Sequence, residues 1–429
     1  METLVIFLGL MIALFVLGVP VAVAIGLTCL AVLALDGGLQ AIPTELFALQ
    51  MLRGINAFPI LAIPFFILAA MLMNVGSATN RIFDFANALV GHIRGGLGHV
   101  NVVASMIFAG MSGTAAADAA GLGQLEIKAM NQRGYPLWFS TGITGASSVI
   151  GPIIPPSVAM VVYGWLSGAS ISALFIAALV PGVLLGLALM ATVLVYSYRI
   201  DLPVAPRPSA GELGRLFARA FLPLLTPVII VGGIWSGVFT PTESGAIASI
   251  YALILGTVIY REVGFREIVD VLRSTVQFTA IILFIIAIAT FYGWLLVRLQ
   301  IPQNLALMLA DLNLSKTALL FAIMGFFVIV GCFMSVVEAV MIFTPIFMVA
   351  IRALGIDPVY FGVLMVVTLS VGVITPPFGN VLYILVGITK LPYEAVVRAM
   401  LPFLVPIFLV IALLIVVPDL VTFLPNHFR

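Results

Sequence analysis

Charged residues are scarce in this chain of 429 residues: only 8% are Asp, Glu, Lys or Arg, whereas 63% are hydrophobic. A water-soluble domain carries about 25% charged residues, so the composition excludes an ordinary soluble protein. The apolar runs are about 20 residues long, which suits membrane helices better than the alternating strands of a membrane barrel. We therefore expect an all-α polytopic membrane protein embedded in a lipid bilayer.

Cysteine, histidine and catalytic motifs are also nearly absent. The two cysteines lie far apart in apolar segments, and the three histidines show no metal-ligand spacing. The net charge of +1 implies no nucleic acid or other strongly charged partner. There is no His-Glu-x-x-His or phosphate-loop lysine motif, and Ser157 has no histidine in a core span to act as its base. We expect no enzyme activity, no cofactor and no direct coupling to ATP.

What the chain does contain is a proline-rich interruption inside an apolar run. Residues 151–157 read Gly-Pro-Ile-Ile-Pro-Pro-Ser, within a run that spans about 137–166. Each proline lacks an N–H, and its ring clashes with the carbonyl one turn back, so the helix must break here. Broken backbone survives at membrane depth only inside protein or beside a water-filled cavity. The break is therefore the first candidate for a functional site.

The pattern returns once, at a fixed distance along the chain. Residues 372–380 read Gly-Val-Ile-Thr-Pro-Pro-Phe-Gly-Asn, and Gly372 follows Gly151 by 221 residues (372 − 151). The same offset relates two early prolines, Pro20 and Pro241, and two glycine-rich turns, at Gly110 and Gly331. A single offset that aligns several features is a strong repeat signal. We predict a first repeat at 1–200, a polar linker at 201–218 and a second repeat at 219–429.

Each repeat should hold a re-entrant helical hairpin followed by a broken helix. The hairpins are predicted at about 97–130 and 315–354, and the broken helices at about 137–166 and 358–389. Further spans are expected at 57–73, 170–198, 219–260, 281–297 and 400–421. The run at 4–35 is one kinked span or two short helices, and the lack of a basic start favours a retained helix over a cleaved signal. The polar stretches at 78–95 and 261–274 are expected to be interfacial arms, and 36–54 a polar connection.

Basic residues indicate that the repeats are inverted. Arg94, Lys128 and Arg133 flank the first hairpin, which the positive-inside rule places at the cytoplasmic face. Arg261, Arg266 and Arg273 precede the span at 281–297, which then carries the second hairpin to the outer face. This topology requires two helices within 4–35. Inverted repeats with paired broken helices are typical of secondary transporters that bind substrate and Na⁺ near the bilayer midplane.

Small polar residues gather at the two hairpin tips and the two breaks. Hydroxyl and carbonyl oxygens suit Na⁺, and glycine lets backbone approach closely. We predict one sodium site per repeat, from Ser112, Gly113, Thr114, Gly145, Ser147, Ser148 and Gly151 in the first and from Ser335, Thr368, Ser370, Gly372, Thr375 and Asn380 in the second. The alternative is that these small residues only allow tight helix packing, although packing does not require proline breaks.

Three carboxylates lie inside apolar segments. Asp118 and Glu338 follow the two tips at an offset of 220 (338 − 118), which favours a shared role in binding substrate or orienting the tip. A structural carboxylate is the alternative. Glu243, after Thr240, is expected to cap a helix start. We assign the substrate-binding or tip-orienting role also to residues of the breaks, namely Pro155, Pro156, Ser157, Pro376 and Pro377.

Four motifs in order resemble the large membrane subunit of the tripartite ATP-independent periplasmic (TRAP) transporters. They are Gly-Met-Ser-Gly-Thr-Ala at 110–115, Gly-Pro-Ile-Ile-Pro-Pro-Ser at 151–157, Phe-Thr-Pro-Thr-Glu at 239–243 and Gly-Val-Ile-Thr-Pro-Pro-Phe-Gly at 372–379. The resemblance covers nearly the whole chain and places it in the wider ion transporter superfamily. It implies Na⁺-driven import of organic acids such as sialic acid or C4-dicarboxylates across the bacterial inner membrane, by an elevator mechanism.

The resemblance also implies two protein partners. A periplasmic binding protein would deliver the substrate, a small organic anion, and a small four-helix membrane subunit, here expected as a separate chain, would brace the scaffold. Two alternatives stay open at this point: a stand-alone Na⁺/carboxylate symporter of similar architecture, and a channel or scaffold without coupled transport. Paired breaks within one chain argue against a channel, because channel filters usually arise from symmetric oligomers.

Overall fold

A computed structural model describes residues 7, 9–11, 13–15, 17–38, 40 and 43–427, and within them every regular element is a helix. A helix needs about 20 apolar residues to cross a bilayer. Among the described residues, eight helical stretches are long and apolar enough: Phe58–Val75, Ile171–Ser197, Ala210–Trp235, Pro241–Ile259, Phe265–Arg298, Lys316–Phe333, Val336–Ala353 and Tyr393–Val416. The predicted all-α polytopic membrane fold is confirmed.

The N-terminal part of the chain breaks at the early proline. Helix α2 (Val21–Gly37) begins directly after Pro20, and the helix expected at 4–17 lies only partly within the described residues, of which 7, 9–11 and 13–15 are helical. The polar connection expected at 36–54 is largely helical, because α3 (Thr44–Ile55) packs along α14 (Phe265–Arg298). Phe47 of α3 meets Phe291 of α14 edge to face, with ring centroids 4.7 Å apart. One face of α3 therefore packs against the core through the partly buried Phe47 and Met51.

The next elements follow the predicted pattern. The span at 57–73 is the short helix η2 (Phe58–Leu61) continued by α4 (Ala62–Val75). Helix α5 (Ala78–Val90) is amphipathic: Ile82, Phe83 and Ala86 are buried, whereas Asn80 and Asp84 are exposed. Helix α11 (Ile171–Ser197) is the span expected at 170–198.

Two predicted boundaries in the second part of the chain are wrong. The linker drawn at 201–218 ends at Ser209, which caps α12 (Ala210–Trp235) by accepting a hydrogen bond from the Glu212 N–H at 3.2 Å. The span at 281–297 is the second part of α14, which starts at Phe265 and so absorbs most of the arm expected at 261–274. No proline and only one glycine, Gly293, interrupt its 34 residues, so nothing ends the helix before Arg298.

The stretch at 219–260 holds two helices rather than one. Helix α12 ends at Trp235, a turn with Gly237 at φ 71° follows, and α13 (Pro241–Ile254) continues into one π-helical turn, η3 (Leu255–Ile259). Thr240 and Glu243 form a capping box at the start of α13: the Glu243 carboxylate accepts from the Thr240 N–H at 2.8 Å. The predicted capping role of Glu243 is confirmed.

The hairpin and broken-helix segments adopt the predicted bounds within a few residues. The first hairpin segment is α6 (Gly96–Ser112), α7 (Ala115–Ala120) and α8 (Leu122–Gln132), and the second is α16 (Lys316–Phe333) and α17 (Val336–Ala353). The broken helices are α9 (Leu137–Ser148) with α10 (Val158–Ser167), and α18 (Pro358–Gly372) with α19 (Asn380–Thr389). The remaining elements are α15 (Ile301–Asp311), α20 (Tyr393–Val416) and α21 (Asp419–His427). The last predicted span, at 400–421, therefore begins earlier and ends in a separate short helix.

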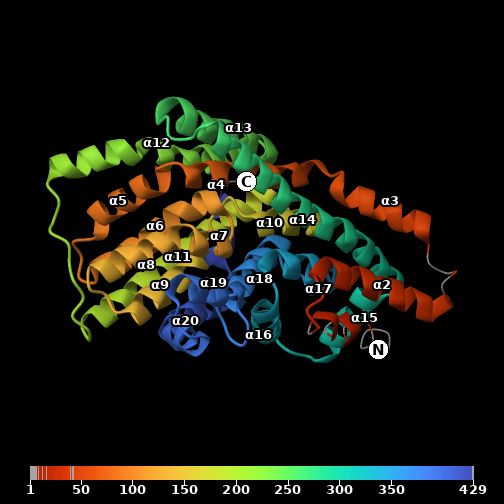
Figure 1. The fold of residues 1–429 in the computed structure, drawn as a ribbon. Coiled ribbons are helices and arrows are strands. Elements are labelled where there is room, and N and C mark those ends of the chain that lie inside the picture. The colour runs from red at the N-terminus through yellow and green to blue at the C-terminus, as the bar shows by residue number, and fades with distance from the viewer. Residues whose placement is uncertain are drawn as a thin grey trace.

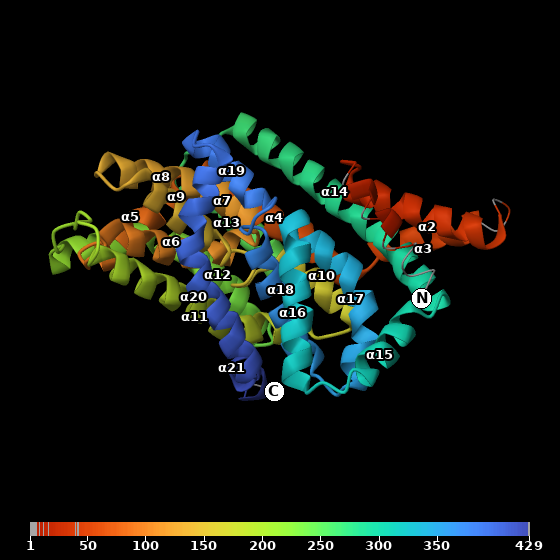
Figure 2. The same cartoon turned by 90° about the horizontal axis from the view of Figure 1, so that it is seen from below.

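Helices α10, α17, α18 and α19 lie near the centre of the molecule, whereas α2 and α3 lie at one end, to which α14 extends from the middle (Figures 1 and 2). Helix α10 packs against α17 and α18, and α19 packs against α7 and α9. Each broken helix therefore places its second part against the hairpin segment of the other half of the chain.

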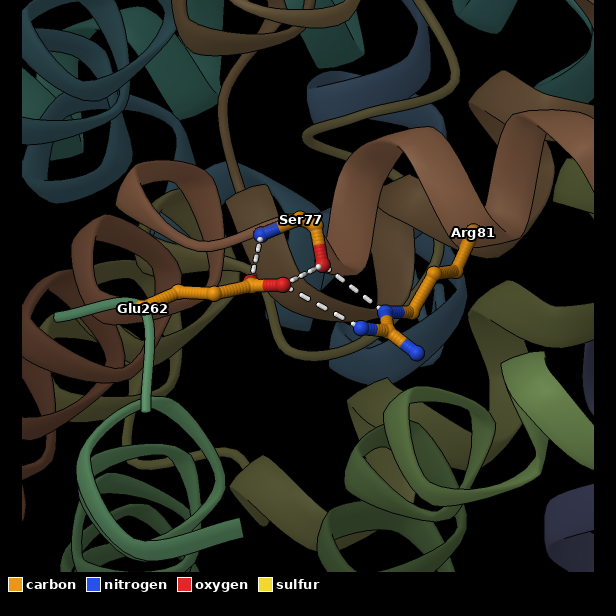
Figure 3. A network of polar contacts seen from close by, with 3 residues as sticks. All are labelled: Ser77, Arg81 and Glu262. Carbon is orange, nitrogen blue, oxygen red and sulfur yellow. Dashed lines mark hydrogen bonds and ion pairs between the residues drawn. The ribbon is translucent and has the colours of Figure 1, made fainter. Parts of the chain in front are cut away.

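A polar network joins the turn before α5 to the turn before α14 (Figure 3). The Glu262 carboxylate accepts hydrogen bonds from the Ser77 N–H and the Ser77 hydroxyl, both at 2.8 Å, and pairs with Arg81 at 3.2 Å. The Arg81 guanidinium also lies 3.9 Å from the centroid of the Tyr260 ring. The hydrogen bonds from Ser77 hold the pKa of Glu262 below its usual value. The network ties α5 to the segment that leads into α14.

Candidate ion and substrate site

The first hairpin tip is a sharp reversal between α6 and α7. Helix α6 ends at Ser112, Gly113 takes a left-handed φ of 64°, and the Thr114 hydroxyl caps α7 by accepting from the Ala117 N–H at 3.2 Å. Only glycine adopts this φ at no cost. The Ser112 hydroxyl is buried and has no hydrogen-bond partner among the described residues. It is a free oxygen ligand inside the protein.

The first break leaves residues 149–157 outside regular helix between α9 and α10. The peptide bond between Pro155 and Pro156 is cis. Ser157 then caps α10, because its hydroxyl accepts from the Met160 N–H at 3.3 Å and donates to the Pro152 carbonyl. The Ser157 hydroxyl therefore has a structural task at the helix start.

The structure brings the first tip and the first break into direct backbone contact. A Cβ on Gly113 would lie 2.8 Å from the Pro156 carbonyl oxygen, and a Cβ on Gly151 would lie 2.9 Å from the Thr114 carbonyl oxygen. Such distances are too short for any side chain, so both contacts require glycine. The carbonyl oxygens of Thr114 and Pro156 thus lie against the two glycines at this contact, and the buried hydroxyl of Ser112 directly precedes Gly113 in the chain. All three are hard oxygen donors of the kind that an alkali cation prefers.

The second tip and second break also touch. The Gly379 N–H donates to the Cys332 carbonyl at 2.8 Å, and a Cβ on Gly331 would lie 2.7 Å from the Leu369 carbonyl oxygen. Gly372 lies directly against Gly331. The Thr375 hydroxyl donates to the Val371 carbonyl at 2.8 Å. The Pro376–Pro377 bond is cis, and Tyr393 of α20 donates to the Pro377 carbonyl at 2.6 Å, which fixes the break from outside.

The two tip carboxylates do not share a role. Glu338 orients its tip as predicted: its carboxylate accepts from the Ser335 N–H at 2.9 Å, while the Ser335 hydroxyl accepts from the Glu338 N–H at 3.4 Å. Asp118 is 1% exposed, and neither carboxylate oxygen has a hydrogen-bond partner among the described residues. Asp118 therefore makes no hydrogen bond that would orient its tip, and its role in binding substrate stays a prediction. The offset of 220 is the reason for the missing hydrogen bond, because the helix position that matches Glu338 is occupied by Ala117 and Asp118 points elsewhere.

Several other predicted site residues make contacts away from the tips. A Cβ on Gly145 would lie 2.7 Å from both Leu385 and Met400, so this glycine serves the packing of α9 on α19 and α20. The Ser148 hydroxyl donates to the Gly145 carbonyl at 2.8 Å. In the second half, the Thr368 hydroxyl lies 3.2 Å from the Met324 sulfur and Ser370 donates to Val366 at 2.6 Å, while Asn380 is exposed at the start of α19.

The structure adds a buried polar network that the sequence did not reveal. Ser147 donates to the Asn101 amide oxygen at 2.7 Å, the Asn101 amide donates to the Thr144 hydroxyl at 2.7 Å, and Ser105 donates to Ser147 at 3.1 Å. All four are at most 1% exposed. Asn101 and Ser105 are four residues apart in an apolar helix, and this spacing was the available signal. The network fixes α6 against α9 beneath the tip.

This arrangement defines a class of protein before any comparison. Backbone that leaves the helix at two central places, each held by a tip of small residues, is the architecture in which membrane transporters bind ions and substrate. The fold agrees with that class. The YdaH transporter of Alcanivorax borkumensis has a similar fold: the match covers 92% of this chain and 96% of that chain, with a TM-score of 0.68 and 14% identity. The match to MtrF of Neisseria gonorrhoeae covers 90% of this chain and 85% of that chain, with a TM-score of 0.56 and 13% identity.

The family follows from sequence similarity. Residues 8–420 match the model of the DctM component of the tripartite ATP-independent periplasmic transporters. The sialic acid TRAP transporter large permease protein SiaM of Vibrio cholerae is 42% identical over 98% of this chain and 97% of its own length. The 2,3-diketo-L-gulonate large permease of Escherichia coli is 39% identical (97% of each chain), as is the C4-dicarboxylate large permease of Pseudomonas aeruginosa (88% and 89%). The chain belongs to the TRAP transporter large permease family: it is a membrane permease of a tripartite system and not an enzyme.

Proposed function

We propose that the protein is the large membrane subunit of a sodium-coupled importer of small organic acids in the bacterial inner membrane. Three relatives are named for carboxylic acids, namely sialic acid, 2,3-diketo-L-gulonate and C4-dicarboxylates, and a fourth is named for isethionate, a sulfonic acid. A periplasmic binding protein delivers the acid, and a small four-helix membrane subunit, as a separate chain, supports the scaffold. Exposed apolar side chains on α14 offer a surface for lipid or for that subunit, including Val276, Ile281 and Phe284.

The main support for sodium coupling is the contact between tip and break in the first half of the chain. Ser112 contributes a buried hydroxyl that has no hydrogen-bond partner among the described residues, and Thr114 and Pro156 contribute carbonyl oxygens beside two obligatory glycines. These residues fit Na⁺, which prefers hard oxygen ligands. When bound, the ion would draw the tip onto the break by neutralising partial negative charges that otherwise repel. In the second half, Ser335, Gly372 and Thr375 form the corresponding site.

The repeat offset supports two repeats of the same helical plan, which in our proposal are inverted and move as an elevator. Matching helix ends in the two halves differ by 221 residues. Helix α9 starts at Leu137 and α18 at Pro358 (358 − 137), and α6 ends at Ser112 and α16 at Phe333 (333 − 112). The two tips and breaks form one block, because each broken helix packs against the hairpin segment of the other half. Rigid-body movement of such a block against a scaffold is the usual form of alternating access.

The test is reconstitution of this chain in liposomes with and without its two partner proteins. We expect uptake of a labelled organic acid only in the complete system and only with an inward Na⁺ gradient. Ser112→Ala combined with Thr114→Ala should weaken the Na⁺ response while membrane insertion stays intact. Uptake by the isolated chain would instead identify a stand-alone symporter. Uptake by the complete system that ignores the Na⁺ gradient would disprove sodium coupling.

A further inference from the structure

A partly polar cleft of about 660 Å³ opens between α8 and α19, and none of the residues that line it belongs to a tip or a break. Helix α8 belongs to the first hairpin segment and α19 to the second broken helix, so opposite halves of the chain form its two walls. Sites for drug-sized ligands have volumes of about 300–1,000 Å³ and often lie between helices of a bundle. The cleft is therefore large enough for a sugar acid or a dicarboxylate.

Each wall of the cleft is one face of a helix. Gln124, Ile127, Lys128 and Asn131 of α8 line it, and these positions repeat with the spacing of three and four residues that defines a helix face. The opposite wall contributes Ile384, Gly387, Ile388 and Thr389. The cleft thus has a largely polar wall from α8 and a largely apolar wall from α19. A compact organic acid also has polar groups and an apolar part, so the two walls can contact both.

The polar wall carries hydrogen-bond donors that the described part of the protein does not use. The side chains of Gln124, Lys128 and Asn131 make no hydrogen bond or ion pair with any described residue. Thr389, by contrast, already donates to the Leu385 carbonyl at 2.7 Å and accepts from the Leu391 N–H. Lys128 is the only charged residue among the lining, so the field inside the cleft favours an anion.

We propose that this cleft is a second substrate subsite, in which Lys128 binds the carboxylate of the transported acid and the two amides bind its other oxygens. The inference rests on the proposed function. Lys128 and Arg133 place this end of α8 at the cytoplasmic face by the positive-inside rule. The subsite therefore receives the acid after it leaves the tips and before it enters the cytoplasm.

Gly387 provides a steric test of the cleft. No atom lies within 4 Å of a Cβ built on it, so there is open space at this position and Gly387→Leu should fill part of the cleft. Gly325 of α16 has the same open surroundings but lies outside the cleft, so Gly325→Leu is the matched control. Lys128→Gln removes the charge at nearly constant length, and Lys128→Arg keeps the charge.

The experiment measures initial uptake in proteoliposomes that contain the complete tripartite system, with labelled sialic acid and labelled succinate as probes. Lys128→Gln and Gly387→Leu should lower uptake of an accepted acid by roughly threefold to tenfold, the range of one charged hydrogen bond that is partly exposed to water. Lys128→Arg should recover part of the uptake that Lys128→Gln loses, and Gly325→Leu should transport like the wild type. The Na⁺ concentration for half-maximal uptake should not change, because none of the residues that line the cleft is a proposed sodium ligand.

A labelling experiment tests the site even if a variant inserts poorly. In a Cys29→Ser, Cys332→Ser background that transports, Asn131→Cys should react with a water-soluble maleimide, and the accepted acid should slow that reaction. Asp311→Cys, on exposed α15, should react at the same rate with or without the acid. Normal uptake by Lys128→Gln and Gly387→Leu, or unprotected Asn131→Cys, would overturn the subsite. Failure of the wild-type system to take up either acid would count against the proposed substrates instead.

Discussion

Gly113→Ala tests whether the contact between tip and break is where sodium acts. The new Cβ would lie 2.8 Å from the Pro156 carbonyl oxygen, whereas ordinary contacts begin at 3.4 Å. The tip and the break must then separate by about 0.6 Å, and such overpacking typically costs about 1–3 kcal/mol. Alanine at a left-handed φ adds about 1–2 kcal/mol of backbone strain.

The separation should weaken the site by moving its oxygen ligands apart. If about 1.4 kcal/mol of the cost falls on the ion-bound state, the Na⁺ concentration for half-maximal uptake rises about tenfold. The assay is Na⁺-dependent uptake in proteoliposomes, with the amount of inserted protein measured in the same samples. Gly134→Ala is the matched control, because Gly134 has φ 83° but no atom within 4 Å of its Cβ position.

Comparing these two variants separates the effect of backbone strain from the effect of the contact between tip and break. Gly134→Ala should lower thermal stability without changing the Na⁺ response, whereas Gly113→Ala should change both. A wild-type Na⁺ response in an inserted, folded Gly113→Ala protein would refute a sodium site at this contact. If Gly134→Ala shifted the Na⁺ response as much as Gly113→Ala does, backbone strain alone would explain the effect.

Two further predictions concern the second tip and the link to α14. Ser335→Ala removes the hydroxyl of the capping box, which typically costs about 1 kcal/mol, and together with Thr375→Ala it should weaken the Na⁺ response; an unchanged response would place the second ion elsewhere. Glu262 has a lowered pKa in the folded state, so its stabilising contribution is present above its unfolded pKa and is lost as the pH falls through the folded value. Thermal unfolding between pH 7 and pH 3 should therefore depend less on pH in Glu262→Gln than in the wild type, and identical pH profiles would contradict a role for this network in stability.

Sequence patterns predicted the elements that depend on local chemistry. Proline excludes continuous helix at 155–156 and 376–377 whatever surrounds it, so the breaks could be placed to within a few residues. The cap at Glu243 was also predictable, because Thr240 and Glu243 have the spacing of a capping box. These features are encoded within a few neighbouring residues, and tertiary packing does not change them.

The elements that the sequence did not reveal depend on distant partners. Helix α3 is stable because it packs along α14, more than 200 residues later, and its polar composition hid this. The network of Asn101, Thr144 and Ser147 joins two helices that the sequence places in different segments. Gly145 was predicted to belong to an ion site, but it packs against Leu385 and Met400, which lie in the other half of the chain. Long-range packing decides which small residue lines a site and which only allows close approach.

The one-residue difference between offsets of 220 and 221 makes the two tips chemically unequal. In the second half, Glu338 falls at the position that closes a capping box, so the tip satisfies its own N–H group with its own carboxylate. In the first half, alanine takes that position, and Asp118 is rotated by about 100° around the helix. The Ser112 hydroxyl and the Asp118 carboxylate therefore both remain buried without partners in the described structure. Because unpaired buried oxygens are costly, the first tip has more to gain from a cation than the second. We therefore expect the first site to bind Na⁺ more tightly, and replacements at the first tip to affect coupling more strongly than the matching replacements at the second.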